Sequence, residues 1–174
     1  MILIAAAASL ILIIIDQLTK YAAIYYLEPI GTYPLVDGVF ELAFVMNYGA
    51  SFGILQGGRV FFVVVTPFIL IGLVVYYLRL PKQKPYNWVR LSLVLIFSGA
   101  LGNFADRARQ GYVIDFFYAK FIDFPVFNMA DSFIVTGTFL FAVLLLFVVK
   151  DDSKKSGLKK PDAAGDGGEI KNDG

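Results

Sequence analysis

The sequence predicts an all-α integral membrane protein with four transmembrane helices, a small outward-facing β platform and a short interfacial helix. Of its 174 residues, 58% are hydrophobic and only 17% are charged, and the mean hydropathy is +0.71. A soluble domain of this length carries roughly a quarter charged residues. The charged residues are also segregated, leaving long uncharged stretches between them. This distribution indicates that most of the chain faces lipid.

Four apolar stretches have the length of membrane spans. Crossing about 30 Å of hydrocarbon takes roughly 20 residues of helix, and the candidates are residues 2–27, 60–78, 88–105 and 131–149. With an insert at 28–58 they form one predicted membrane domain, residues 1–150. The first stretch also resembles a secretory signal peptide, but no Lys or Arg precedes its apolar core and the helical pattern continues past Lys20. We therefore expect an uncleaved span.

Basic residues predict the orientation of the spans. They are concentrated between the second and third spans and after the fourth, at Arg79, Lys82, Lys84, Arg90, Lys150, Lys154, Lys155, Lys159 and Lys160. Because cytoplasmic loops are enriched in Lys and Arg, both termini are expected in the cytoplasm and the connections 28–58 and 106–130 outside. The polar segment 151–174 contains almost nothing apolar and is predicted to be a disordered cytoplasmic tail.

The first outer connection contains the predicted β platform. Large apolar residues fall at every second position of 40–47, the pattern of a half-buried strand. Asp37-Gly38 is a turn signal just before it, and residues 33–36 are a possible partner strand. The following segment, 49–55, is predicted as a short interfacial helix closed by Gly57-Gly58.

Composition restricts the chemistry that the chain can perform. There is no cysteine and no histidine, and the net charge is +1. These absences exclude disulfides, thiol chemistry and Ser-His-Asp catalysis, and they disfavour a zinc site. We expect no cofactor and no metal, and the lack of a basic patch predicts no nucleic-acid partner. Hydrolysis would then require carboxylates or a Ser-Lys pair, and the lysine at membrane depth, Lys20, already has Asp16 as a partner.

Polar residues converge near one membrane face. Asp16 lies roughly 22 Å into the first span at about 1.5 Å per residue, and Lys20 follows one helical turn later on the same face. The ends of the third and fourth spans and of the candidate strand reach the same depth. The residues expected there are Asp16, Lys20, Asn47, Asn103, Asp106, Arg107, Asp115, Asn128 and Asp131.

Taken one at a time, most of these residues have a purely structural explanation. Asp16 and Lys20 could form an ion pair, Asp106 could terminate a helix, and Asp131 could be the N-cap of the fourth span. Asp115 is different, because it lies in the apolar run 111–117, where an unpaired carboxylate is costly. Two carboxyl groups within hydrogen-bond reach share one proton. Such a pair can activate water and protonate the developing oxyanion and the leaving amine.

These residues occur in five sequence blocks that together resemble the lipoprotein signal peptidase family, also called signal peptidase II. The blocks appear in the same order as in the family. They are Asp16-Gln17-Leu18-Thr19-Lys20, Asn47-Tyr48-Gly49-Ala50-Ser51-Phe52, Gly99-Ala100-Leu101-Gly102-Asn103-Phe104-Ala105-Asp106-Arg107, Gly111-Tyr112-Val113-Ile114-Asp115-Phe116 and Phe127-Asn128-Met129-Ala130-Asp131. The stretch 117–127 is shorter than is usual for the family, and the tail is an addition to the family's pattern.

The resemblance implies an aspartic endopeptidase of the bacterial inner membrane. It would cleave the signal peptide from diacylglyceryl-modified prolipoproteins just before the lipidated cysteine, and it would be inhibited by the cyclic peptide globomycin. Asp115 and Asp131 match the catalytic pair. The supporting positions are matched by Asp16, Lys20, Asn47, Asn103, Asp106, Arg107 and Asn128.

Two other classes remain as alternatives. A small ion-coupled transporter also places ionisable residues in the membrane, but transporters often carry internal repeats and interrupted helices at the midplane, and no repeat is evident here. A structural membrane anchor would not need Asp115 in an apolar segment. Cleavage of a lipidated peptide by purified protein discriminates among the three.

Overall fold

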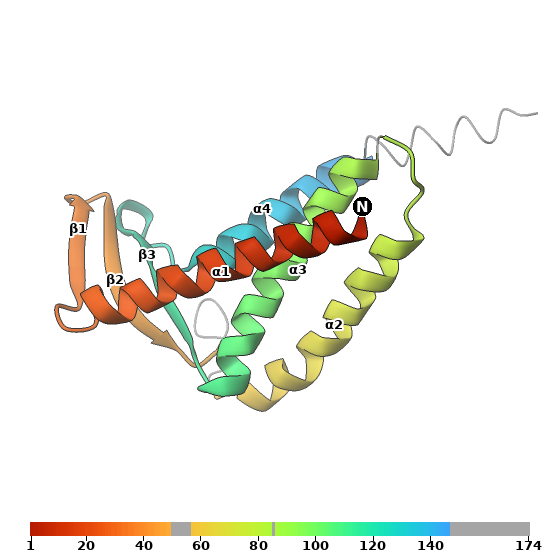
Figure 1. Ribbon diagram of the computed structural model, residues 1–174. Helices are drawn as coiled ribbons and strands as arrows, with labels where there is room; N and C mark the ends of the chain where they lie inside the picture. Colours follow the sequence, from red (N-terminus) through yellow and green to blue (C-terminus); the bar gives the residue numbers. More distant parts are fainter. Residues whose placement is uncertain (50–56, 85, 147–174) are drawn as a thin grey trace, which may run out of the picture.

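Four α-helices and a small sheet make up most of the part of the molecule that the structure describes. The computed structural model describes residues 1–49, 57–84 and 86–146. The helices are α1 (Ile2–Leu27), α2 (Arg59–Arg79), α3 (Tyr86–Arg109) and α4 (Met129–Leu144). Figure 1 shows the sheet at one end of the helices and the N-terminus at the other. Within the described ranges, α1, α2 and α3 are long and apolar enough to cross a membrane, and α4 is a shorter apolar helix.

The helices confirm the predicted fold class and adjust some limits. The first span has the predicted ends, and α2 extends the second by one residue at each end. The third was predicted to end at Ala105, whereas α3 continues to Arg109, so Asp106 and Arg107 belong to its last turns. The predicted end of the fourth span, the tail 151–174 and most of the predicted interfacial helix lie outside the described residues.

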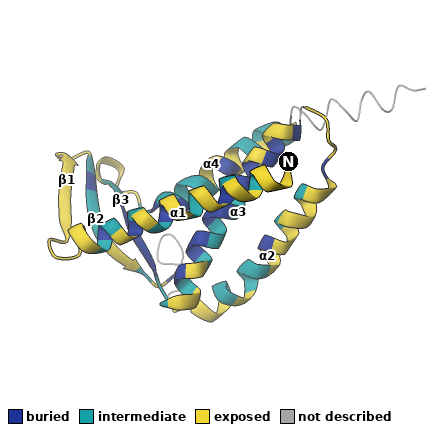
Figure 2. Ribbon diagram, viewed as in Figure 1, coloured by how far each residue is buried: buried dark blue, intermediate teal, exposed yellow. Residues whose placement is uncertain are grey.

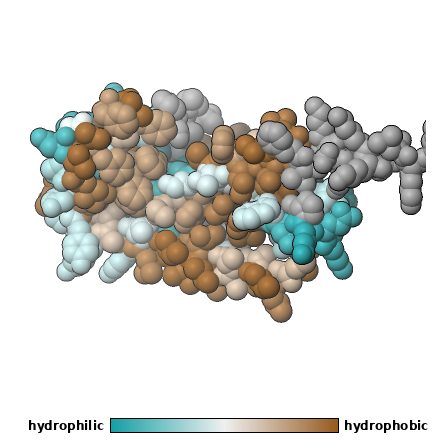
Figure 3. All heavy atoms as spheres, turned by 90° about the horizontal axis from the view of Figure 1, so that it is seen from above, coloured by the Kyte–Doolittle hydropathy of each residue, from teal (hydrophilic) through white to brown (hydrophobic). Residues whose placement is uncertain are grey.

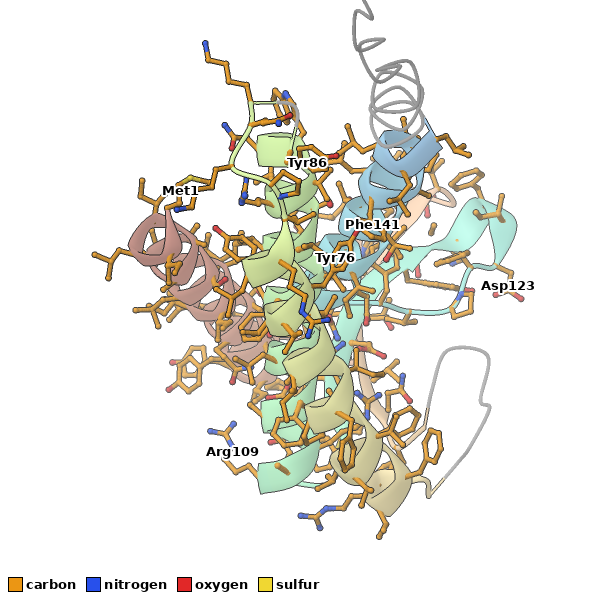
Figure 4. All side chains as sticks on the ribbon, turned by 90° about the vertical axis from the view of Figure 1, so that its right-hand side faces the viewer. Met1, Tyr76, Tyr86, Arg109, Asp123 and Phe141 are labelled. Atoms are coloured by element: carbon orange, nitrogen blue, oxygen red, sulfur yellow. The ribbon has the colours of Figure 1, made fainter. Side chains whose placement is uncertain are left out.

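Helix α3 is the central helix, against which the other three pack. Glycines permit the closest approach: a Cβ at Gly137 of α4 would lie 2.8 Å from the backbone oxygen of Ser92, and one at Gly99 would collide with the backbone oxygen of Ala130. Near the opposite end of α4, the rings of Tyr76 and Phe141 meet edge to face at 5.8 Å, as Figure 4 illustrates.

The outer faces of the helices are apolar. Figure 2 shows that α1 and α2 are exposed along most of their length, whereas α3 carries many buried residues. Leu3, Leu10 and Phe68 are among the exposed large hydrophobic side chains. Figure 3 shows hydrophobic side chains over much of the molecular surface, with hydrophilic ones gathered toward the two ends. An apolar exterior of this extent is expected of a protein whose helices are surrounded by lipid.

The sheet has three antiparallel strands in the order β1-β2-β3: β1 (Thr32–Val36), β2 (Phe40–Asn47) and β3 (Val113–Ala119). The limits of β2 are those predicted. Strand β3 was not predicted from the sequence, because four consecutive residues from Val113 are buried and the strand therefore lacks alternation of apolar and polar residues. Its β-branched and aromatic composition was the available signal.

Strand β3 is held between β2 and the end of α1. Val45 lies opposite Asp115, and Asn47 lies opposite Val113. Ile114 and Phe116 pack with Ala23 and Leu27 of α1 in a buried apolar cluster. The strand thus carries Asp115 against the helices at the sheet end of the bundle.

Candidate active site

Asp115 lies in the interior of the protein and receives two amide hydrogen bonds. Its side chain is on β3 and the residue is 2% exposed. Asn47 Nδ2 donates to its Oδ2 at 2.8 Å, and Asn128 Nδ2 donates to its Oδ1 at 2.6 Å. Burial, followed by the negative charge of Asp131, raises the pKa of Asp115 to about 7, although the two amides and the charge of Lys20 act in the opposite direction. This carboxyl group can therefore exchange a proton near neutral pH.

Asp131 is held at the start of α4 by a capping box. The N-cap of α4 is Asn128. Asp131, the N-cap suggested by the sequence, is instead the third residue of the helix. The backbone N–H of Asp131 donates to Asn128 Oδ1 at 2.9 Å, and Asp131 Oδ2 accepts from the backbone N–H of Asn128 at 3.2 Å. Its other oxygen, Oδ1, accepts from Asn103 Nδ2 at 2.8 Å. Both carboxylate oxygens are thus oriented by neighbouring N–H groups.

Asn128 connects the two aspartates. Its side-chain nitrogen bonds Asp115, and its side-chain oxygen and backbone bond Asp131. Asn128 is completely buried, so its side of each bond is shielded from solvent. The geometry brings the two carboxyl groups to one place from elements that are separated along the chain.

Lys20 is the centre of a buried ion cluster behind Asp131. Its Nζ donates to Asp16 Oδ2 at 2.8 Å, to Asp106 Oδ2 at 2.6 Å and to Asn103 Oδ1 at 2.8 Å. The same Asn103 donates to Asp131. All three of the lysine's donors are therefore satisfied, as a buried ammonium group requires.

Asp16 also joins the first helix to the last. Its Oδ1 accepts a hydrogen bond of 2.9 Å from the backbone N–H of Ala130, in the first turn of α4. Such N–H groups have no partner inside their own helix. The carboxylate of Asp16 therefore provides a hydrogen-bond acceptor for one of the unpaired N–H groups at the start of α4.

Arg107 links α3 to the segment after β2. Its Nη2 donates to the backbone oxygen of Gly49 at 2.7 Å, and its guanidinium lies 4.5 Å from the ring centroid of Phe62. The N–H of Gly49 in turn donates to Asn47 Oδ1 at 2.9 Å. Among the described residues, no group accepts a hydrogen bond from the buried Nε of Arg107.

The structure brings together all nine residues singled out from the sequence, but it also shows contributors that the sequence analysis missed. Gln17 Nε2 donates to Asp106 Oδ1 at 3.1 Å and to Asp16 Oδ2 at 3.2 Å. Gly102 leaves room for Asp16, since a Cβ there would lie 2.6 Å from Asp16 Oδ2. Both residues belong to the sequence blocks that resemble the signal peptidase II family, and no other feature of the sequence indicated that they contribute to the site. Within ranges 1–49, 57–84 and 86–146, no three acidic side chains are grouped as metal ligands.

Comparisons with known proteins identify the family. Residues 8–147 match the model of the family described as signal peptidase (SPase) II. The lipoprotein signal peptidase of Caldanaerobacter subterraneus is 46% identical over 138 residues, covering 78% of this chain and 90% of that protein. The lipoprotein signal peptidase of Brevibacillus brevis is 44% identical over 144 residues, covering 83% and 93%.

Solved structures support the same assignment. A bacterial membrane enzyme determined by the in meso method superposes with a TM-score of 0.74 at 35% identity, covering 90% of this chain and 93% of that one. A second bacterial membrane enzyme gives 0.73 at 33% identity, covering 83% and 93%. The chain is a multi-pass bacterial membrane protein and belongs to the signal peptidase II family.

Proposed function

We propose that this protein removes the signal peptide from diacylglyceryl-modified prolipoproteins, using Asp115 and Asp131 as an aspartic catalytic pair. Membership of the signal peptidase II family, and relatives named lipoprotein signal peptidase, support the peptidase activity and the prolipoprotein substrate. One observation carries the assignment of the pair: Asn128 bonds both carboxyl groups, and the pKa of Asp115 is raised to about 7. The pair therefore retains one proton near neutral pH.

The reaction needs one ionised and one protonated carboxyl group. The ionised group accepts a proton from water as that water attacks the carbonyl carbon of the scissile peptide bond. The protonated group donates to the carbonyl oxygen, on which charge develops. Collapse of the tetrahedral intermediate breaks the C–N bond, and a proton passes to the leaving amine. The same two groups thus serve both steps.

The surrounding residues orient the pair. Asn47 and Asn128 hold Asp115, and Asn103 holds Asp131 against the Lys20 ion cluster. Preorganised hydrogen-bond donors of this kind need no rearrangement at the moment of reaction. We assign Asp16, Asp106 and Arg107 the same supporting role. Cleavage occurs before the lipidated cysteine, and globomycin binds in the same place by contacts spread over Asn47, Asn103, Arg107 and apolar surface.

The proposed orientation places both termini in the cytoplasm and the active site at the outer face. The distribution of Lys and Arg between the loops supports this orientation. A reporter fused after Lys84 should give a cytoplasmic signal, whereas one near Asp37 or Lys120 should give an external signal. An external signal after Lys84 would overturn the orientation. In the proposed orientation, the tail 151–174 lies on the face opposite the site, and we assign it no catalytic role.

The catalytic assignment is tested by single-turnover cleavage of a lipidated prolipoprotein. Asp115→Asn and Asp131→Asn each preserve size but remove the shared proton, so each should lower the rate more than about a hundredfold. The double variant should be scarcely slower than either single variant, because groups that act as a unit are non-additive. Globomycin binding should persist in part in all three preparations.

Asp106→Asn is the matched control, because Asp106 is an equally buried carboxylate in the same network. It should retain more activity than Asp115→Asn. If Asp115→Asn cleaves at a near wild-type rate while Asp106→Asn is inactive, the catalytic pair has been assigned to the wrong residues. The family membership gives no support to an ion-coupled transporter.

A further inference from the structure

We propose that Arg59, at the start of α2, is a positioning residue for Asp115 and acts through a chain of four hydrogen bonds. The inference rests on the proposed catalytic role of Asp115. Arg59 is exposed and touches neither carboxyl group of the pair. Its effect is transmitted through Arg107, Gly49 and Asn47.

Arg59 caps the end of another helix. Its Nε donates to the backbone oxygen of Arg107 at 3.0 Å, and its Nη2 donates to that of Ala108 at 2.8 Å. The last carbonyl groups of a helix have no intrahelical donors. A cation at the N-terminus of its own helix is unfavourable, whereas a cation at the C-terminus of α3 is favourable. The charge of Arg59 is therefore favourable at the C-terminus of α3, although it is unfavourable at the N-terminus of α2.

From Arg107 the contacts continue to the catalytic carboxyl group. Arg107 Nη2 donates to the backbone oxygen of Gly49, and the N–H of Gly49 donates to Asn47 Oδ1. Asn47 Nδ2 then donates to Asp115 Oδ2. An amide has an acceptor end and a donor end, so fixing the oxygen of Asn47 on Gly49 directs its nitrogen toward Asp115.

The turn after α3 adds a second contact. Gly111 has a φ of +90°, and a Cβ there would lie 3.3 Å from Arg59 Cδ. The chain between α3 and β3 thus passes directly over the arginine side chain. Two residues later β3 begins at Val113, which pairs with Asn47. Arg59 therefore contacts the segment that leads into β3, the strand that carries Asp115 and pairs with Asn47.

The expected consequence is a change in the proton affinity of Asp115. The charged groups that act on its carboxyl group are Asp131 of α4, Lys20 of α1 and Arg107 of α3. The amides that bond it are those of Asn47 and Asn128. A poorly directed Asn47 stabilises the ionised form less, and the pKa of Asp115 rises further. The alkaline limb of the pH–rate profile, along which the pair loses its remaining proton, should then move to higher pH.

The first experiment compares Arg59→Gln with Arg109→Gln. Arg109 is exposed at the same end of α3, as Figure 4 shows, and its substitution removes the same charge without removing a cap. We expect Arg59→Gln to lower the single-turnover rate by roughly three- to thirtyfold, the effect of losing about one hydrogen bond, and to move the alkaline limb to higher pH. Arg109→Gln should do neither. An equal shift in both variants, or none in Arg59→Gln, would overturn the proposal.

The second experiment tests whether Arg59 acts through Asn47. In an Asn47→Ala background the amide is absent, so adding Arg59→Gln should produce no further shift of the alkaline limb. A shift of the same size in both backgrounds would show an action by another route and overturn the proposal. Thermal unfolding, measured on every variant, identifies any preparation that has not folded.

Asp115→Asn, assayed in parallel, distinguishes a failure of the catalytic role proposed for Asp115 from a failure of the positioning role proposed for Arg59. If it cleaves at the wild-type rate, the catalytic assignment fails and the positioning role fails with it. If it is inactive but Arg59→Gln is unchanged, the chain of contacts alone is refuted.

Discussion

Asn128 donates a hydrogen bond of 2.6 Å to Asp115 with its side-chain nitrogen, while its side-chain oxygen caps α4. One residue therefore performs two tasks that belong to different levels of the structure. Capping determines where α4 begins, and hence where Asp131 lies. Donation to Asp115 determines how the other carboxyl group is oriented.

The two tasks of Asn128 can be separated by substitution. Serine is a good N-cap but is too short to reach Asp115, so Asn128→Ser should keep most of the stability and lose activity. Asn128→Ala should lose both, with a further decrease of about 1 kcal/mol in the free energy of unfolding from the lost cap. Thermal unfolding and single-turnover cleavage of both variants test this. Near wild-type activity in Asn128→Ser would argue against a catalytic effect of the bond to Asp115.

Asp115 should make the wild-type protein less stable as the pH rises. The folded-state pKa of Asp115 is raised from 3.8 to about 7, so the folded protein binds this proton more tightly than the unfolded chain does. The stabilisation is fully present at pH values below about 4 and is lost as the pH rises toward 7. At about 1.4 kcal/mol per pKa unit, the loss is up to about 4 kcal/mol.

The neutral variant Asp115→Asn should escape this loss. Its unfolding temperature should exceed that of wild type at pH 8, and the difference should shrink toward pH 4. Unfolding in detergent across that pH range measures both proteins. A difference that is constant with pH would show that Asp115 does not titrate in this window.

Gly102 should tolerate no side chain. A Cβ there would lie 2.6 Å from Asp16 Oδ2 and 3.6 Å from the Cβ of Ala130. Gly102→Ala should therefore displace the Asp16 carboxylate and lower the free energy of unfolding by about 1–3 kcal/mol, the usual cost of overpacking. Gly72→Ala in α2 is the control, because a Cβ there has no neighbour within 4 Å. If both variants unfold like wild type, the contact between α1 and α3 is looser than described.

Lys20 should be indispensable for stability, unlike a lysine with an equally short ion pair elsewhere. Lys20→Met leaves Asp16 and Asp106 buried without a counter-ion and should cost about 3–5 kcal/mol. Lys120 also pairs at 2.6 Å, with Glu41, but its side chain is 48% exposed, so Lys120→Met should change the free energy of unfolding far less. Adding Asp106→Asn to Lys20→Met should restore part of the loss. If Lys20→Met and Lys120→Met unfold at the same temperature, burial does not determine how much an ion pair contributes to stability.

The sequence allowed prediction where the signal is local. The limits of α1 followed from a long apolar stretch, interrupted at Asp16, Gln17 and Lys20, and those of β2 followed from the alternation of apolar residues. Strand β3 was not predicted, because both of its faces are covered near Asp115 and its sequence therefore lacks an alternation of apolar and polar residues. The cap of Asp16 on the N–H of Ala130 joins residues 114 positions apart, and no local pattern records such a contact. The residue types of the site were readable from the sequence, but their hydrogen-bond partners required the fold.

That bond between the first helix and the last has a consequence for how the enzyme is made. The chain emerges from the ribosome with α1 first, and the backbone N–H that Asp16 satisfies belongs to α4, which is synthesised last. Asp131 lies in the same turn of α4. A partly synthesised chain therefore lacks the second aspartate and leaves a carboxylate of its first span without one of its partners. With Asp131 as one of the proposed catalytic pair, peptidase activity can arise only after α4 has been inserted, so the membrane is not exposed to an active fragment during biogenesis.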